Sequence, residues 1–210
     1  MGNTNFLYLL GALLVLLLGT PLAHDLGLGS EPLVRGILIS VLLLVGVWSL
    51  KGGRRFFIAG MTFAVVGVAF NVFAINLESM AFRICSVLTL LGFLVVAISF
   101  TLRQVIFGTE MNVNRLVGAI CVFLLLGLIW SFAYALLELA MPGSFKGFSP
   151  GQGPGEDSNW QYFSFVKLTT LGYGDITPVS ATPRSLAFLQ AVAGQFYVSL
   201  LYTSPSPRDS

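Results

Sequence analysis

The sequence predicts an all-α membrane protein with six transmembrane helices, and with a short helix and loop that re-enter the membrane between the fifth and the sixth. Three observations support this fold class. Hydrophobic residues make up 56% of the 210 residues and charged residues only 10%, so little of the chain suits a water-exposed surface. The mean hydropathy is +0.87. The chain also contains six apolar runs of about 20 residues, the length that a membrane-spanning helix needs.

The first apolar run extends from Phe6 to Ala23. No basic side chain precedes it, whereas a secretory signal peptide usually begins with positive charge. A first membrane helix is therefore favoured, and a signal peptide cleaved after Ala23 is the alternative. His24, which follows the run, is interpreted as a solvated loop residue.

Three further runs follow at short intervals, and they extend over Pro32–Leu50, Phe56–Ile75 and Ala81–Phe100. The loop over residues 51–55 carries three of the basic side chains. Because Lys and Arg beside a span stay on the cytoplasmic side, this loop is predicted to lie inside. Alternation of the spans then predicts a cytoplasmic N-terminus and an extracellular segment after the fifth run, in a multi-pass protein of the cell (plasma) membrane.

The fourth run lacks the charges of a voltage sensor. Such a sensor needs Arg or Lys at every third residue, because each charge that crosses the field contributes roughly 2.3 kcal/mol per 100 mV. After Arg83 the third-residue positions are Ser86, Thr89 and Gly92, and Arg103 comes only at the inner end. Weak or absent voltage dependence is therefore predicted.

Other residues of the chain are given structural interpretations. Asn71, inside the third run, is expected to make an interhelical hydrogen bond rather than to bind a ligand. Cys85 and Cys121 lie inside apolar runs and are interpreted as packing residues, not as a disulfide or a metal pair. The chain shows no nucleophile and base or metal-ligand cluster, so an enzyme is not predicted. The net charge of +2 is too small and too scattered to predict a nucleic-acid partner.

The last two runs, Val117–Met141 and Ala181–Tyr202, enclose the most informative part of the chain. Residues 142–157 are rich in Gly, Pro and Ser, which predicts an irregular outer loop. The sequence Ser158-Asn159-Trp160-Gln161 matches a capping box and predicts a short helix that ends at about Thr169. This helix is too short to span the membrane, so the non-helical backbone after it must line a cavity.

The short helix leads into the stretch Thr169-Thr170-Leu171-Gly172-Tyr173-Gly174-Asp175. Its alternating glycines permit left-handed and right-handed backbone conformations in turn, so that successive carbonyl groups can point to one side. The stretch resembles the selectivity filter of tetrameric potassium channels of the prokaryotic type, with Leu171 in the place of the valine of TVGYG. The resemblance by motif covers residues 117–201.

This resemblance implies a potassium-selective channel that conducts K⁺ passively through a homotetrameric pore in membrane lipid, with no cofactor other than the permeant ion. The implied ion-binding residues are Thr170, Leu171, Gly172, Tyr173 and Gly174. The implied supports of the filter are Thr169, Asp175, Tyr162, Trp160 and Glu138. For Tyr162, Trp160 and Glu138 a position at the membrane interface is the alternative. Gly194 stands where such channels carry a hinge glycine, and close helix packing is its alternative role.

The predicted organisation is a four-helix N-terminal domain over residues 1–112, a pore domain over 113–202 and a tail over 203–210. The tail carries two prolines and resembles translated adapter sequence, so it is expected to be non-native or truncated, with a possible missing cytoplasmic regulatory domain. Lys167 departs from the family pattern and is expected to reduce conduction. Two alternative functions stay open: a subunit of a potassium uptake system, and a membrane sensory or binding protein with a vestigial filter.

Overall fold

The computed structural model describes residues 6–26, 31–50, 53–77, 79–107, 113–147 and 157–203. Its described part is almost entirely helical. The elements, in chain order, are α1 (Phe6–Asp25), α2 (Glu31–Ser49), α3 (Arg54–Leu77), α4 (Met80–Phe107), α5 (Val113–Ala140), β1 (Phe145–Lys146), α6 (Asp157–Leu168), β2 (Thr177–Pro178) and α7 (Ala181–Thr203). Of the predicted tail, only Thr203 falls within the described residues.

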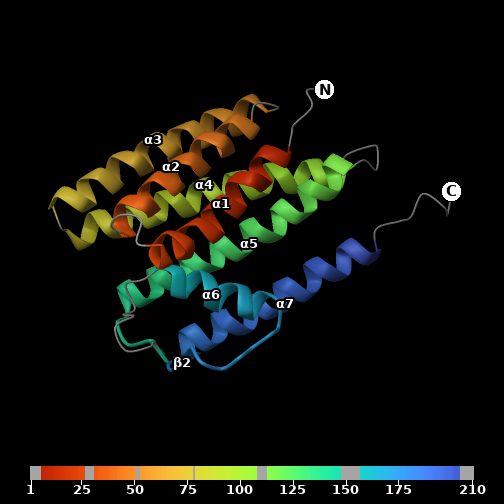
Figure 1. Cartoon of the computed structure of the whole chain (residues 1–210). Helices are drawn as coiled ribbons and strands as arrows, with labels where there is room; N and C mark the ends of the chain where they lie inside the picture. The colour runs from red at the N-terminus through yellow and green to blue at the C-terminus, as the bar shows by residue number, and fades with distance from the viewer. Residues whose placement is uncertain are drawn as a thin grey trace.

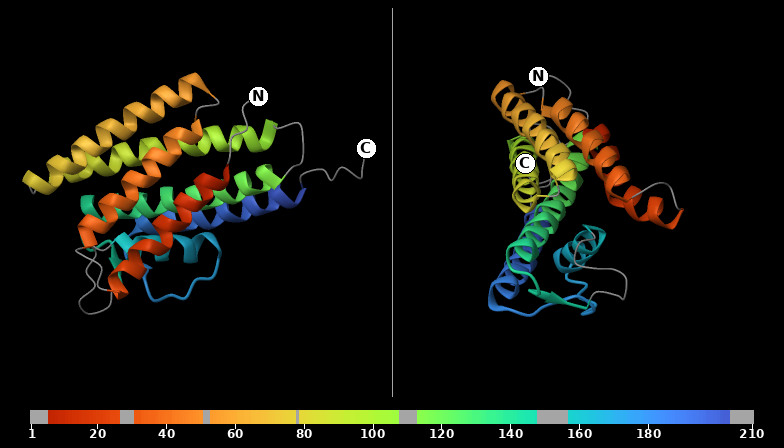
Figure 2. Two further views of the ribbon diagram at one scale, coloured as in Figure 1. Left: turned by 45° about the horizontal axis from the view of Figure 1, so that its top comes forward. Right: turned by 90° about the vertical axis from the view of Figure 1, so that its left-hand side faces the viewer.

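The long helices run alongside one another, and α6 is a short helix at the lower side of the group (Figure 1). Helix α3 packs against α4, α4 against α5, and α1 against both α2 and α5. Figure 2 shows α3 and α4 on one side of the molecule, and α6 with the loop that follows it on the other. The described chain begins and ends at one end of the group, and β2 lies at the opposite end (Figure 1).

Four helices of the described part are long and apolar enough to cross a membrane, over Phe6–Ala23, Arg54–Phe73, Met80–Phe107 and Val113–Ala140. Helix α2 contains a shorter apolar section, Gly36–Ser49. Helix α7 has 23 residues, but its sequence includes Arg184 and two glutamines. The prediction of an all-α, multi-pass membrane protein is confirmed to this extent.

Helices α4 and α5 extend furthest beyond one end of the predicted apolar runs. Helix α4 continues past Phe100 to Phe107, and α5 begins at Val113 rather than at Val117. Polar side chains stabilise these ends: Thr101 Oγ1 donates to the Ala97 carbonyl at 2.9 Å, and Arg115 Nε donates to the Val105 carbonyl at 2.6 Å. The predicted apolar runs are therefore shorter than these two helices.

The main hydrophobic core joins α1, α2, α4 and α5 around fully buried side chains such as Leu13, Phe93 and Leu128. Helix α1 is also fixed to α5 at its first turn, where Phe6 N donates to Asn114 Oδ1 at 3.1 Å. A second cluster of buried side chains lies between α5, α6 and the start of α7. This second cluster supports the segment described next.

Candidate functional site

Helix α6 and the segment after it form a return loop at one end of α7. The helix has 12 residues, about 18 Å at 1.5 Å per residue, and it begins at Asp157, one residue before the predicted Ser158. It runs from the end of α5 toward the middle of α7, and residues 169–178 then return to the start of α7 (Figure 1). The glycine-rich stretch thus lies between the end of α6 and β2.

The backbone of the 169–175 segment alternates in handedness. Thr170, Gly172 and Gly174 have positive φ values of 61°, 59° and 82°. Within the described residues, Thr170 is the one non-glycine residue with positive φ, a conformation that is strained for a β-branched side chain. Strain of this kind persists where the surroundings impose it, often at functional sites. The alternation predicted from the two glycines is present, and it begins one step earlier, at Thr170.

The amide N–H groups of the segment fix the direction of its carbonyl groups. Leu171 N and Gly172 N both donate to the Val166 carbonyl, at 3.0 and 3.3 Å. Thr170 N donates to the Lys167 carbonyl at 3.1 Å. In a trans peptide the N–H and C=O groups point in opposite directions, and no described peptide is cis. The three carbonyls that precede these amides therefore point away from α6, onto one side of the segment.

The aromatic and acidic side chains of the segment are held by Tyr162 of α6. The rings of Tyr162 and Tyr173 stack with their centroids 6.3 Å apart and an interplanar angle of 7°. The Tyr162 hydroxyl donates to Asp175 Oδ2 at 2.5 Å. Leu171 is 57% exposed and Tyr173 67% exposed in the single chain, so one side of the segment is not covered by its own subunit.

This hydrogen bond changes the pKa of both partners. The bond from Tyr162 favours the ionised carboxylate and lowers the pKa of Asp175. The same bond is the largest of the effects that raise the pKa of Tyr162 to about 12. The phenol therefore remains a donor, and the carboxylate an acceptor, throughout the neutral pH range.

We expect Tyr162→Phe to raise the pKa of Asp175 toward its ordinary value of 3.8. A lowered pKa means that the ionised, hydrogen-bonded form is fully present above the ordinary value and is lost as pH falls through the lowered one. Isotope-edited infrared titration of the aspartate carboxyl band measures this shift. The control is Tyr173→Phe, which leaves the Tyr162 donor in place. Equal titration of the wild type and Tyr162→Phe would contradict the assignment.

The loop that follows α5 is bonded on one side to Glu138 and on the other to Val179, which lies after the 169–175 segment. The buried Glu138 carboxylate accepts from Gly143 N at 2.7 Å and from Ser144 N at 3.0 Å. The Ser144 carbonyl in turn accepts from Val179 N at 2.8 Å, just after the segment. Glu138 thus contacts the loop before α6 rather than the segment itself.

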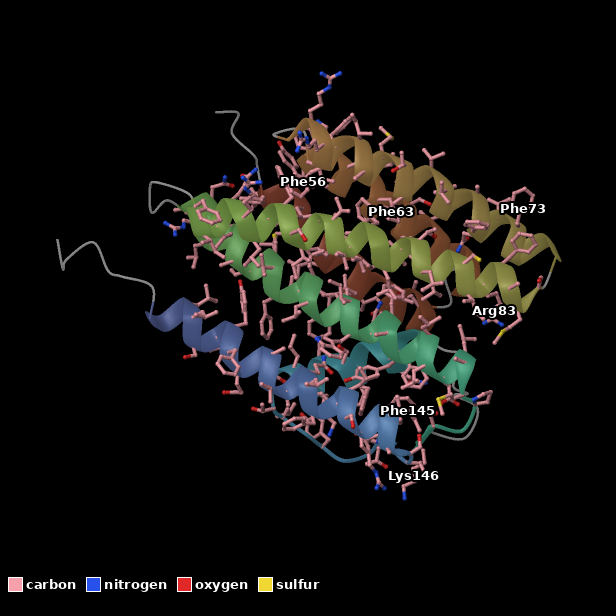
Figure 3. All side chains as sticks on the ribbon, turned by 180° about the vertical axis from the view of Figure 1, so that it is seen from behind. Phe56, Phe63, Phe73, Arg83, Phe145 and Lys146 are labelled. Atoms are coloured by element: carbon pink, nitrogen blue, oxygen red, sulfur yellow. The ribbon has the colours of Figure 1, made fainter. Side chains whose placement is uncertain are left out.

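An antiparallel ladder joins the outer loop to the chain that leaves the segment. Strand β1 pairs with β2, with Phe145 opposite Pro178 and Lys146 opposite Thr177. Figure 3 shows Phe145 and Lys146 close to the first turns of α7. The composition of residues 142–157 predicts an irregular loop here. The ladder was missed because each of its strands has only two residues, too few for a period to appear.

A buried polar network joins α5, α6 and α7, and no pattern in the sequence indicates it. The Tyr134 hydroxyl donates to Gln190 Oε1 at 2.6 Å. Gln190 Nε2 donates to the Ser164 carbonyl at 2.9 Å and to Ser164 Oγ at 2.8 Å. Ser164 Oγ donates to the Gly127 carbonyl at 2.6 Å. The side chains of Tyr134, Ser164 and Gln190 are fully buried, so the network fixes α6 between the two long helices.

Three other predicted residues lie in distinct surroundings. Trp160 is buried against Phe145, with ring centroids 5.0 Å apart, whereas the ring contact with Tyr173 comes from Tyr162. A Cβ added at Gly194 would meet the Leu168 carbonyl at the end of α6, so close packing of α7 requires a glycine here. The Lys167 ammonium lies 5.7 Å from the centroid of the Phe163 ring, one turn back along α6.

A cavity of about 650 Å³ lies behind the segment. Leu171 and Tyr173 line it from the segment, and Leu17 and Pro21 line it from α1. The first helix therefore approaches the back of the 169–175 segment, an approach that no sequence pattern had indicated.

Residues 122–204 match a family model described as an ion channel. The match covers less than half of the chain, and it extends from within α5 to the end of α7, so it includes α6 and the complete 169–175 segment. No curated protein and no solved structure matches the chain. The match, together with the apolar helices, supports ion transport across a membrane as the function of this part.

Proposed function

We propose that the chain is one subunit of a potassium-selective channel in which four identical copies surround a central pore. The observation that supports this proposal is the one-sided set of carbonyls of residues 169–171, in a segment whose residues 170, 172 and 174 have left-handed backbone. One such strand cannot encircle an ion, and its uncovered side offers the surface on which further copies would complete the ring.

In the proposed membrane arrangement, α1 to α5 and α7 are the six spans. Helix α6 and residues 169–178 re-enter from the extracellular side, and the N-terminus is cytoplasmic. The lower hydropathy of α7 is compatible with a helix that faces a water-filled pore. The plasma membrane is the proposed location.

The proposed mechanism is exchange of water oxygens for carbonyl oxygens. K⁺ loses its hydration shell and is bound by rings of carbonyls from residues 170–173, and repulsion between neighbouring ions moves them on. The C-terminal end of α6 carries partial negative charge and points toward the inner end of the filter, where it favours a cation. No step requires a cofactor.

We also propose weak or absent voltage dependence. The described basic side chains of α4 are Arg83 and Arg103, which lie near opposite ends of the helix. A charge near the end of a helix crosses little of the transmembrane electric field when the helix moves. Little gating charge is therefore available from α4.

Rubidium uptake into liposomes containing the purified protein, driven by a potassium gradient, tests the proposal. We expect uptake that barium blocks and that sodium does not support, from a preparation that is tetrameric by native mass spectrometry. A tetrameric preparation without uptake would contradict conduction by this chain.

Lys167→Thr distinguishes a filter whose conduction is lowered by the lysine from a vestigial filter that does not conduct. Removal of the ammonium beside the filter is expected to raise the rubidium uptake, because a fixed cation repels permeant ions. If both the wild type and Lys167→Thr are silent, the sensory or binding alternative is favoured instead.

A further inference from the structure

A second cavity, of about 410 Å³, lies among α2, α3 and α4 and reaches α5. This volume falls in the range of roughly 300–1,000 Å³ that is usual for small-molecule sites. Its polar lining comes from Ser40, Asn71 and Ser86. Phe63 of α3, labelled in Figure 3, also lines it and packs over Gly92 of α4. The ion-channel function above does not use this cavity.

The rim of the cavity includes apolar side chains that are exposed at the surface of the single chain. Ile37 and Leu44 on its rim are 64% and 73% exposed, so a ligand can enter from the lipid. Asn71 lies six residues before the end of α3, and Ser86 six residues after the start of α4. Each is therefore about 9 Å from the end of its helix, at 1.5 Å per residue.

The Asn71 amide has hydrogen-bonding capacity to spare. Its Nδ2 donates to Ser86 Oγ at 3.5 Å, at the outer limit for a hydrogen bond, and the described residues provide no shorter one. A side-chain amide offers two donors and an acceptor, and a polar group at membrane depth is costly when it is not satisfied. The interhelical hydrogen bond expected of Asn71 is thus present, and it is long.

The chemistry of the lining selects the ligand class. None of the lining residues is charged, so a carboxylate, phosphate or ammonium head would find no counter-charge. A hydroxyl group both donates and accepts, and this matches the acceptor and the donors of an amide. The remaining lining is aliphatic or aromatic and suits an apolar body.

Gly36 and Gly67 both line the cavity, and Gly36 has open space beside it. A Cβ added at Gly36 of α2 would meet no atom within 4 Å, and one added at Gly67 of α3 would lie 3.3 Å from Thr89 Oγ1. A larger side chain at Gly36 would therefore enter the cavity without a backbone clash. Helix propensity also favours replacement of a helical glycine.

We propose that this cavity binds a neutral, hydroxyl-bearing membrane lipid, with its hydroxyl group on Asn71 and its apolar body between α2 and α4. Buried Phe132 of α5 lines the same cavity, so the bound lipid contacts the helix that leads into the ion-channel segment. The site is independent of ion selectivity.

Photolabelling of the purified full chain in liposomes tests the site. The probe is a long-chain primary alcohol that carries a diazirine, and the matching diazirine alkane without the hydroxyl is the comparison. We expect the alcohol to label the lining residues of α2–α4 several-fold more than the alkane does, with the labelled peptides identified by mass spectrometry.

Two variants locate the binding. Gly36→Leu should reduce this labelling several-fold, whereas Gly11→Leu, at a helical glycine of α1 that also has open space, should leave it unchanged. Asn71→Leu should abolish the preference for the alcohol, and Thr62→Val on the exposed side of α3 should not. Equal labelling by both probes, or labelling unaffected by Gly36→Leu in a preparation with the wild-type elution profile, would overturn the proposal.

Discussion

Replacement of Gly147 with alanine is expected to reduce rubidium uptake by an order of magnitude or more. Gly147 has a φ of 103°, and a Cβ at this position would collide with the backbone carbonyl of Asp175, the last residue of the 169–175 segment. A backbone atom cannot rotate out of the way as a side chain can, so either the strand or the outer loop has to move. Binding constellations tolerate displacements of only about 0.5 Å, so we expect the proposed ion sites nearest Asp175 to be lost.

Gly143→Ala is the matched control for this effect. Gly143 lies in the same outer loop and also has a positive φ, 82°, but a Cβ there meets no atom within 4 Å. Both alanines carry the cost of a left-handed backbone, roughly 1–2 kcal/mol. Only Gly147→Ala also disturbs Asp175. If the two variants conduct equally, the contact between Gly147 and Asp175 does not support the 169–175 segment.

The local features of the site were predictable from the sequence because they depend on neighbouring residues. The position of α6 followed from a capping pattern and a length, and the backbone alternation followed from the spacing of Gly172 and Gly174. The left-handed conformation of Thr170 was not predictable, since threonine itself disfavours it. That conformation accompanies the hydrogen bond from Thr170 N to the Lys167 carbonyl, which appears only when the chain turns at the end of α6.

The long-range features could not be predicted. Tyr134 and Gln190 are 56 residues apart, and Ser164 lies 37 residues from Gly127. In the sequence, Tyr134, Ser164 and Gln190 are isolated polar residues and Gly127 is an isolated glycine. No periodic pattern indicates that these residues are in contact. The ladder of β1 and β2 is equally non-local. The identity of such partners depends on how the helices pack, and a periodic pattern reports only which face of a helix is apolar.

Gln190→Leu is expected to destabilise the unit formed by α5, α6 and α7. The substitution leaves the Tyr134 hydroxyl without its acceptor and Ser164 without its donor, in a fully buried site. Each lost partner costs about 1 kcal/mol, so we expect the free energy of unfolding to fall by about 2 kcal/mol. Thermal unfolding of the purified protein in detergent should show a midpoint lower by roughly 4–8 °C.

Gln195→Leu is the control, because it makes the same change at an exposed position of α7 and should shift the midpoint little. Tyr134→Phe removes one bond of the network and should cost about half as much as Gln190→Leu. The double variant should then cost less than the two single variants added together, because both remove the same hydrogen bond. Strict additivity would mean that Tyr134 and Gln190 act separately, which would contradict a hydrogen bond that couples α5 to α7.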